Sequence, residues 1–485
     1  MLLEQLIEGM DYLQLLDDVK GVEISNIVYD SRKVVPGSLF VCIEGYKVDG
    51  HRYIREAVNK GAAALVIQKD VVTPEGLPII KHNNPRRVLA EVSARFYDYP
   101  SRKLNLIGVT GTKGKTTTTF MIKSIMEQAG HKVGLIGTIA NYIGDRVVEA
   151  QRTTPESLEL QEMFSEMLSQ KVDTVVMEVS SHSLDLSRVH ACEFDVGIFT
   201  NLTQDHLDFH LNFENYFKAK AKLFDLCKVG KANVDDEYGQ RLLEMKKCPM
   251  QSFGIDHPAD IKAENINIKP EGTSFKVKIP NGDIDVCVPI PGKFSVYNSL
   301  SAISACLCFD VNSNDIIKGL ENLKVPGRAE LVETNKNFTV MVDYAHSPDS
   351  LENILETVKG YAKGRIVVVF GCGGDRDRTK RPIMGQIAGE LADFTVISSD
   401  NPRTEEPEAI ISEIVEGIKR TKGEYIIIAD RHEAIEYAIK NAIENDIIVI
   451  AGKGHETYQI FKDKTVHFDD REIAKDAIEK LEVDS

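Results

Sequence analysis

One segment of the sequence has the residue types and the spacing of a phosphate-binding loop: Gly108-Val-Thr-Gly-Thr-Lys-Gly-Lys-Thr-Thr117. It lies between an apolar run and a helix-like stretch, so backbone N–H groups and a helix N-terminus can face an anion. Lys115 would reach the β- and γ-phosphates of a nucleotide, and the Thr116 hydroxyl would bind Mg²⁺. The strict G-x-x-x-x-G-K-[ST] pattern is not met, because position 109 is valine. A glycine-rich turn without a nucleotide is the alternative.

Carboxylate and imidazole groups follow two further apolar runs. Glu178 lies at the end of VDTVVMEV, with Ser180 and His182 just beyond it, and His206 follows FDVGIFTNL. A carboxylate and a histidine that converge beside the phosphate loop could complete a Mg²⁺ site. Magnesium prefers oxygen ligands, so a histidine ligand would be chemically unusual. Taken singly, either residue is more often structural.

Charged side chains also gather in three short strings. NYFKAKAKLF contains Lys218, Lys220 and Lys222, which by themselves indicate a solvated basic face of a helix. GGDRDRTKRP and DNPRTEEP each follow an apolar run. Their ordinary interpretations are a solvated charged loop and an Asx/Pro turn.

The elements that would position these residues predict an α/β fold in three domains. We expect boundaries near the Pro100 segment DYPSRK and near VPGR, which gives domains at residues 1–102, 103–327 and 328–485. Strands that alternate with helices predict parallel sheets covered on both faces. The strands of the last two domains are expected in LNLIGVT, VDTVVMEV, FDVGIFTNL, FTVMVDYAH, RIVVVFGCGG, DFTVISSDNPR, YIIIADR and DIIVIAGKGHE. Ligands bind at the carboxyl ends of such strands, where the charged strings fall.

Composition narrows the class of protein. The formal net charge of −16 argues against a general nucleic-acid-binding protein, whose footprint would be a basic face. The eight cysteines form no CxxC pair, so no zinc ribbon is indicated. The first residues lack a basic n-region, and no apolar run approaches about 18 residues, so we expect neither a signal peptide nor a membrane span. We therefore expect a cytoplasmic protein.

Ten strings occur in the order seen in the Mur ligases, and the chain resembles that family from about residue 25 to 475. The strings are GTKGKTT, MEVSSHSL, TNLTQDHLDFH, YFKAKAKLF, YNSLSA, PGRAE, DYAHSPDSL, GCGGDRDRTKRP, DNPRTEEP and AGKGHE. The resemblance implies an N-terminal UDP-binding α/β domain, a central P-loop ATPase with a parallel sheet, and a C-terminal Rossmann-like domain.

The resemblance is strongest to the branch of the family that adds meso-2,6-diaminopimelate to UDP-N-acetylmuramoyl-L-alanyl-D-glutamate in peptidoglycan biosynthesis. It implies an ATP- and Mg²⁺-dependent ligase that forms an acyl phosphate and releases ADP, and we expect the protein to be a monomer. Three alternatives stay open. They are a lysine-adding sister ligase, a folylpolyglutamate synthase and a nucleotide-dependent scaffold that kept the fold.

The resemblance also implies roles for particular residues. The implied catalytic residues are Lys115, Lys220, His206 and Asp343. The residues implied to bind the nucleotide are Gly111, Thr112, Lys113, Gly114, Lys115, Thr116, Thr117, Asn298, Arg328 and His346, and those implied to bind the metal are Thr116, Glu178, His206 and Lys220. The residues implied to bind the UDP-linked substrate are Ser31, Thr153, Thr154, Ser180, Arg188 and Lys220, and those implied to bind diaminopimelate are Arg376, Asp400, Asn401, Pro402, Arg403, Gly452 and Glu456.

For some of these residues the sequence offers a structural alternative. QRTTPE also has the pattern of a helix N-cap before Pro155, and Asn298 that of another N-cap. Asp343 has the pattern of a residue in a turn at the end of a strand.

Two of the implied roles have a clear chemical meaning. The family likeness implies a CO₂-derived carbamate on Lys220, which turns a cation into an anionic oxygen ligand for Mg²⁺. Diaminopimelate ends in an α-amino acid group, whereas lysine ends only in an ammonium group. The planar fork of Arg403 can pair bidentately with the extra carboxylate. Asp400 and Glu456 can meet the ammonium group, and Arg376 is a second candidate for the carboxylate.

Overall fold

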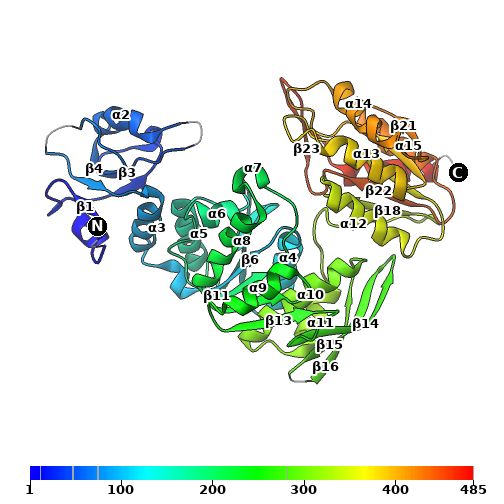
Figure 1. Ribbon diagram of the computed structural model, residues 1–485, viewed down its shortest axis with the longest axis horizontal. Coiled ribbons are helices and arrows are strands. Elements are labelled where there is room, and N and C mark those ends of the chain that lie inside the picture. Colours follow the sequence, from blue (N-terminus) through cyan, green and yellow to red (C-terminus); the bar gives the residue numbers. More distant parts are fainter. Residues whose placement is uncertain (11, 46–47, 74–75, 281, 484–485) are drawn as a thin grey trace. The chain divides into compact units, whose positions relative to one another are not determined.

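The computed structural model describes residues 1–10, 12–45, 48–73, 76–280 and 282–483 (Figure 1). The chain divides into two compact units. The first comprises residues 1–261 and 301–316, and the second comprises residues 262–300 and 317–485. The boundaries that the sequence predicts at residues 102 and 327 stay predictions. None of the helices in the described part of the chain combines the length and the hydropathy that a bilayer-spanning helix requires.

The first unit begins with a five-stranded sheet in the order β1-β5-β4-β3-β2. β2 to β5 are parallel and β1 is antiparallel to β5. The strands are β1 (Gln14–Leu15), β2 (Asn26–Val28), β3 (Ser38–Val41), β4 (Ala62–Ile67) and β5 (Ile79–Lys81). The helices are α1 (Leu3–Leu6), α2 (Ile54–Asn59) and α3 (Pro85–Phe96), and the 3₁₀ turns are η1 (Ser31–Lys33), η2 (Gly50–Tyr53) and η3 (Pro100–Lys103). Asn84 caps α3 through its side chain, and Pro85 occupies the first helical position. Asparagine is a preferred residue at the N-cap, and proline is preferred at the position after it.

The central sheet carries the phosphate-binding segment. Within the first unit its strands run in the order β13-β12-β11-β6-β10-β7-β8-β9. The strands from β13 to β7 are parallel, and β8 and β9 continue as antiparallel strands. They are β6 (Asn105–Thr110), β7 (Val133–Ile136), β8 (Ala140–Ile143), β9 (Arg146–Glu149), β10 (Thr174–Glu178), β11 (Phe194–Phe199), β12 (Cys227–Asn233) and β13 (Met250–Gly254).

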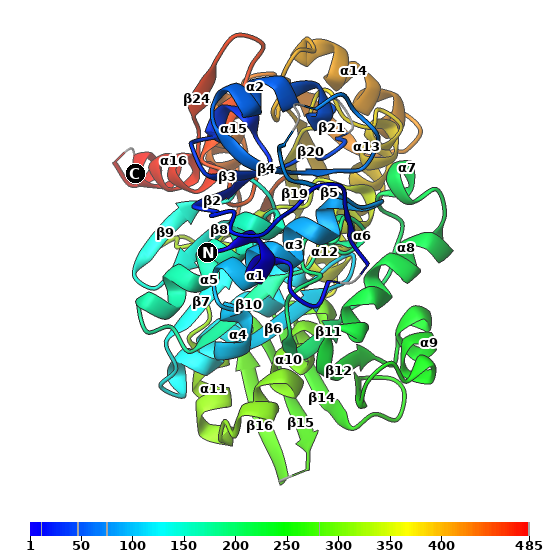
Figure 2. The same ribbon diagram turned by 90° about the vertical axis from the view of Figure 1, so that its left-hand side faces the viewer.

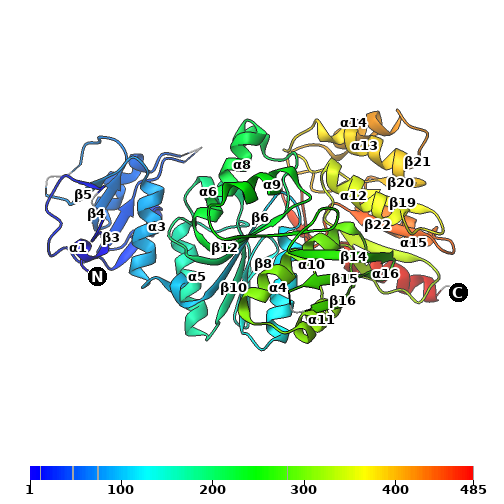
Figure 3. The same ribbon diagram turned by 60° about the horizontal axis from the view of Figure 1, so that its bottom comes forward.

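Helices cover this sheet and close its core. They are α4 (Lys115–Gln128), α5 (Ser157–Ser169), α6 (Ser181–Asp185), α7 (Leu207–His210), α8 (Phe213–Ala221), η4 (Lys222–Asp225) and α9 (Glu237–Met245). α3 lies alongside α5 (Figures 1 and 3). The strand residues Leu106, Val175, Phe194 and Phe199 are fully buried, which explains why these strands are apolar on both faces.

The second unit contains an antiparallel meander and a separate α/β sheet. The meander is β14 (Ile261–Lys269), β15 (Gly272–Ile279) and β16 (Gly282–Val288). The α/β sheet has the order β17-β18-β22-β19-β20-β21, and all its strands are parallel except β17. These strands are β17 (Glu330–Val332), β18 (Thr339–Asp343), β19 (Ile366–Phe370), β20 (Phe394–Ile397), β21 (Glu424–Ile427) and β22 (Ile447–Ala451).

Helices and one hairpin complete this unit. They are α12 (Pro348–Lys359), α13 (Lys380–Leu391), α14 (Pro407–Ile418), α15 (Arg431–Lys440), α16 (Asp470–Val483), and the hairpin β23 (Tyr458–Ile460) with β24 (Thr465–His467). α13 and α14 lie side by side (Figures 1 and 2). α10 (Lys293–Cys306), η5 (Leu307–Phe309) and α11 (Ser313–Glu321) occupy the stretch in which the two units interchange along the chain.

Candidate active site

The phosphate-binding segment forms a tight loop between β6 and α4. Gly111 has a φ of 146° and Gly114 a φ of 85°, conformations that favour glycine. A Cβ atom at Gly111 would come within 1.9 Å of the Thr200 hydroxyl, so no larger residue fits there. Lys115 Nζ donates to the carbonyl oxygens of Gly111 and Thr112, each at 2.9 Å. The loop therefore places its lysine at the rim of a cradle of backbone groups.

A neighbouring strand braces this loop. Asn201 follows β11, which pairs with β6, and its side chain accepts from Lys113 N at 2.9 Å and donates to Lys113 O at 3.2 Å. Thr200 Oγ1 donates to the same carbonyl oxygen at 2.7 Å. Asn201 is not among the residues predicted from the sequence. The available signal was its position directly after a strand that runs parallel to the one before the loop.

The predicted carboxylate lies against the start of α4. Glu178 ends β10 and is 1% exposed. Its Oε1 accepts from Thr116 Oγ1 at 3.0 Å, which brings two predicted metal ligands together. Thr138, which the sequence analysis missed, donates its backbone N–H to Oε1 at 2.8 Å and its hydroxyl to Oε2 at 3.0 Å.

The three lysines of α8 differ sharply in environment. Lys220 is 1% exposed, and its Nζ donates to Gly111 O at 2.7 Å. Burial and the nearby charge of Lys115 hold the pKa of Lys220 well below its usual value, which shifts the equilibrium toward the neutral amine. Lys218 and Lys222 are exposed. A solvated basic face therefore describes these two lysines and is wrong for Lys220.

Aromatic rings connect His206 to the same region. His206 is the residue before α7 and has a φ of 52°, and its ring centroid lies 4.8 Å from that of His182 and 6.3 Å from that of Tyr216. The Tyr216 ring lies 4.6 Å from Lys220 Nζ, and its hydroxyl hydrogen-bonds to Thr112 Oγ1 at 3.2 Å. Tyr216 thus contacts both the buried lysine and the phosphate loop.

The donor set fits Mg²⁺ by its chemistry. No cluster of three histidine, cysteine, aspartate or glutamate side chains suited to a metal occurs among the described residues. The predicted ligands include only two such residues, Glu178 and His206. The carboxylate and hydroxyl oxygens of Glu178 and Thr116 already adjoin, as a cation that prefers oxygen requires.

Four of the residues predicted to bind the UDP-linked substrate lie near the end of β10. Thr154 Oγ1 donates to Glu178 O at 2.8 Å and accepts from Ser180 N at 3.1 Å. Arg188 donates to Thr154 O at 3.1 Å. The Thr153 hydroxyl hydrogen-bonds to that of Thr138 at 3.0 Å.

The structural alternative for Thr153 and Thr154 can now be tested. α5 begins only at Ser157, and its N-cap position is Glu156, so the interpretation of Thr153 or Thr154 as a helix N-cap is wrong. Ser180 instead caps α6 by accepting from Ser183 N at 3.1 Å.

A buried carboxylate links these residues to the N-terminal sheet. Glu156 pairs with Arg188, with Arg86 of α3 at 2.7 Å and with Arg152 at 3.9 Å. Glu156 is not among the residues predicted from the sequence, because its partners are up to 70 residues away in the chain. The predicted uridine-nucleotide residue, Ser31, lies in η1 after β2, where its hydroxyl donates to Glu56 Oε2 at 3.2 Å.

In the second unit, residues predicted to bind diaminopimelate cluster around Asn401. Asn401 Oδ1 accepts from Ile460 N at 2.9 Å and from Lys453 Nζ at 3.3 Å. Asn401 Nδ2 donates to Glu456 Oε2 at 2.8 Å, and the fully buried Lys453 donates to the same oxygen at 3.0 Å. Lys453 is another residue that the sequence analysis did not identify.

Arg403 follows Pro402 and is held in place by the loop after β19. Its φ is 54°, and its Nη1 donates to Gly374 O at 2.8 Å. Nε and Nη2 make no hydrogen bond among the described residues, so this edge of the guanidinium remains for a ligand. Arg376 is exposed. Gly452 has a φ of 118°, and a Cβ there would lie 2.8 Å from Asp400 Oδ2, so glycine is needed for this close approach.

Three of the predicted nucleotide-cleft residues meet at the end of β18. Asp343 ends this strand, as its turn-like pattern indicated, and accepts from Ala329 N at 2.7 Å. Burial raises the pKa of Asp343, while the positive charge of Arg328 opposes that rise. The Arg328 guanidinium lies 4.7 Å from the Tyr344 ring centroid, and the His346 ring lies 4.5 Å from it.

Asn298 is buried inside α10, which begins at Lys293. The alternative interpretation of Asn298 as a helix N-cap is therefore wrong.

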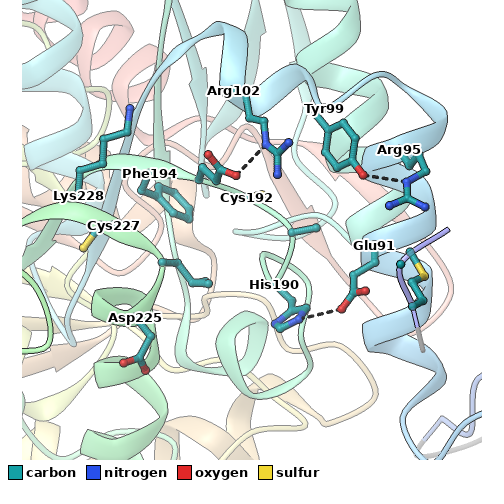
Figure 4. A pocket seen from close by; sticks show the side chains of 15 residues that line it. Glu91, Arg95, Tyr99, Arg102, His190, Cys192, Phe194, Asp225, Cys227 and Lys228 are labelled. Atoms are coloured by element: carbon teal, nitrogen blue, oxygen red, sulfur yellow. Dashed lines mark hydrogen bonds and ion pairs between the residues drawn. The ribbon is translucent and has the colours of Figure 1, made fainter. Parts of the chain in front are cut away.

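A cavity of about 520 Å³ lies at the opposite edge of the central sheet, where β11 and β12 begin (Figure 4). Four of its side chains form two pairs: His190 lies 3.1 Å from Glu91, and Arg102 lies 2.7 Å from Glu193. The phosphate loop follows the other ends of the parallel strands. The cavity therefore contains none of the predicted site residues.

Comparisons with known proteins agree with this arrangement. Family models match residues 23–97 (Mur ligase family, catalytic domain), 109–306 (Mur ligase middle domain) and 327–454 (Mur ligase, glutamate ligase domain). A protein of Clostridium botulinum (strain ATCC 19397 / Type A) is 49% identical, over 99% of this chain and 100% of its own length. This chain belongs to the Mur ligase family.

Two other Mur ligases and one neighbouring enzyme extend the comparison. The Clostridium botulinum protein and a 51% identical protein of Clostridium acetobutylicum, also over 99% of this chain and 100% of its own, are named UDP-N-acetylmuramoyl-L-alanyl-D-glutamate–2,6-diaminopimelate ligases. A solved structure of a ligase of that name shares 29% identity and a TM-score of 0.71, covering 95% of each chain. A folylpolyglutamate synthase of Mycobacterium tuberculosis covers 75% of this chain and 91% of its own, at 16% identity and a TM-score of 0.61, and shows similarity of fold alone.

The family and the three-domain α/β fold predicted from the sequence are therefore confirmed, and the chain is an ATP-dependent Mur ligase that uses ATP and Mg²⁺.

Proposed function

We propose that this Mur ligase joins meso-2,6-diaminopimelate to UDP-N-acetylmuramoyl-L-alanyl-D-glutamate, with conversion of ATP to ADP and phosphate. The observation that carries the proposal is the DNPR loop, in which Arg403 is fixed through Gly374 while its Nε–Nη2 edge remains for a carboxylate. The names of relatives that match nearly the whole chain support the same substrates.

The proposed reaction has two steps. A carboxylate oxygen of the UDP-linked substrate attacks the γ-phosphorus of ATP; an O–P bond forms, the bond to the β-phosphate oxygen breaks, and ADP leaves. The neutral amine of diaminopimelate then attacks the acyl carbon, the amide bond forms as the nitrogen releases a proton, and phosphate leaves with the electron pair of the C–O bond. Such chemistry depends mostly on positioning and charge neutralisation. Lys115 and the backbone groups of residues 111–117 would hold the β- and γ-phosphates.

We assign the metal to Thr116, Glu178, His206 and Lys220, of which the first two adjoin. Bound Mg²⁺ would neutralise charge on the phosphate oxygens. The neutral amine favoured by the burial of Lys220 is the form that reacts with CO₂. Its nitrogen forms a bond to the carbon and releases a proton, which gives an anionic carbamate.

For the remaining site residues we propose the roles that the family resemblance implies. Asn298, Arg328, Asp343 and His346 are proposed for the nucleotide, and the substrate is proposed to contact a second set: Ser31, Thr153, Thr154, Ser180 and Arg188. Diaminopimelate would place its distal carboxylate on Arg403, with Arg376 beside it, and its ammonium on Asp400 and Glu456. Asn401, Pro402 and Gly452 would shape this pocket. We propose that the protein is a cytoplasmic monomer with domains at 1–102, 103–327 and 328–485.

Phosphate release tests the function directly. The purified protein is given ATP, Mg²⁺ and the UDP-linked dipeptide, with meso-diaminopimelate or lysine as acceptor. We expect release that depends on both substrates and is much faster with diaminopimelate. A preference for lysine would identify the lysine-adding sister activity, and release independent of any acceptor would favour the scaffold alternative.

A further inference from the structure

The segment Gly137-Thr138, directly after β7, contacts Glu178 from the side opposite the phosphate loop. Thr138 gives Glu178 two hydrogen bonds, from its N–H at 2.8 Å and from its hydroxyl at 3.0 Å. Among the described residues, this hydroxyl provides the hydrogen bond that Oε2 accepts. The carboxylate is thus fixed at both oxygens, because Thr116 donates to Oε1.

Gly137 supplies the room for this arrangement. A Cβ at residue 137 would lie 2.6 Å from Glu178 Oε1 and 3.3 Å from its carboxyl carbon. Its backbone is not in the left-handed region, so alanine could adopt the same conformation. The need for glycine here comes from the carboxylate and not from the chain itself.

Thr138 also contacts a residue assigned to the substrate. Its hydroxyl donates to Glu178, so its oxygen can accept from the Thr153 hydroxyl at 3.0 Å. The four side chains form one continuous path, from Thr153 through Thr138 and Glu178 to Thr116. Such outer contacts set the orientation of a carboxylate ligand, and their loss typically weakens a metal site roughly 10- to 100-fold.

We propose that Thr138 is a positioning residue that fixes the Glu178 carboxylate for the divalent cation and joins it to the substrate side, and that Gly137 is required for its approach. This inference rests on the proposed function, in which Glu178 is a metal ligand. Neither residue belongs to the sites assigned above.

The test measures cation binding without turnover. Free Mn²⁺ is followed by electron paramagnetic resonance in the presence of full-length protein and ADP. Thr138→Val keeps the shape and removes the hydroxyl, and we expect its Mn²⁺ affinity to fall roughly tenfold or more. Thr138→Ser restores a hydroxyl and should bind within about threefold of the unsubstituted protein. Thr118→Val is the matched control, because Thr118 is a buried threonine of α4 whose hydroxyl has no partner in the described structure.

A second variant and a reference variant separate the outcomes. Gly137→Ala should weaken Mn²⁺ binding as Thr138→Val does, and it leaves every hydroxyl in place. If Glu178→Gln loses Mn²⁺ while Thr138→Val and Gly137→Ala bind it as tightly as the unsubstituted protein, this inference is overturned and the metal assignment stands. If Glu178→Gln itself binds Mn²⁺ normally, the assignment of Glu178 to the metal and this inference fail together.

Discussion

Replacement of Arg403 by alanine should remove the preference for diaminopimelate over lysine. The guanidinium is held by Gly374 through Nη1, which leaves its Nε–Nη2 edge for a bidentate pair with the distal carboxylate. Truncation of one partner of a desolvated charge pair costs about 2–5 kcal/mol. Arg403 is only half-buried, so we expect the lower half of that range, about 2–3.5 kcal/mol. At about 1.4 kcal/mol per factor of ten, the preference should fall roughly 30- to 300-fold.

The assay compares kcat/KM for the two acceptors in the same variant. Arg403 has a φ of 54°, and arginine and alanine both carry a Cβ atom, so the substitution changes the side chain without adding backbone strain. Any general effect of the substitution on the loop acts on both acceptors and cancels in the ratio. Arg420→Ala, an exposed arginine of the same unit, is the control and should leave the ratio unchanged. A ratio in Arg403→Ala within threefold of that of the unsubstituted protein would refute the role of the fork.

Three further predictions concern the first unit. Lys220→Ala should abolish turnover, with partial rescue by bicarbonate or a short carboxylate in the assay; unchanged turnover would exclude a metal-ligand role. Asn201→Ala removes two hydrogen bonds from Lys113, each worth about 0.5–1.5 kcal/mol, and should weaken ADP binding roughly 5- to 100-fold by calorimetry, whereas unaltered affinity would show that the loop needs no brace. Burial alone would raise the pKa of Glu91, but hydrogen bonds from His190, Tyr12 and Arg87 outweigh it and lower this pKa to about 2. The resulting stability is present above the usual glutamate pKa and is lost as the pH falls toward 2, so Tm should drop more steeply from pH 5 to 3 than in Glu91→Gln, and parallel slopes would contradict this.

The glycine loop and the strand-end residues could be predicted because their signals are local. Gly111, Gly114 and Lys115 lie within five residues, and the apolar runs on either side predict a strand and a helix. Glu178 ends its strand as expected, and parallel pairing of β10 with β6 brings it to Thr116. Alternation of strands and helices likewise predicted the parallel sheets.

Other features depended on contacts between distant segments. Nothing in NYFKAKAKLF shows which lysine is buried, since that depends on how α8 packs against the phosphate loop. The partners of Glu156 come from α3 and from the segment after α6, and Lys453 meets Asn401 from 52 residues away.

The sequence alone determined the family, the order of strands and helices and the chemical groups available, because these follow from residue type and short-range spacing. The tertiary structure decided which groups are buried, paired or left for a ligand. Thr138 shows the reason: its hydroxyl acquires a role only when β7 and β10 lie side by side, and desolvation and hydrogen bonding depend on distances in space between residues 40 positions apart in the chain.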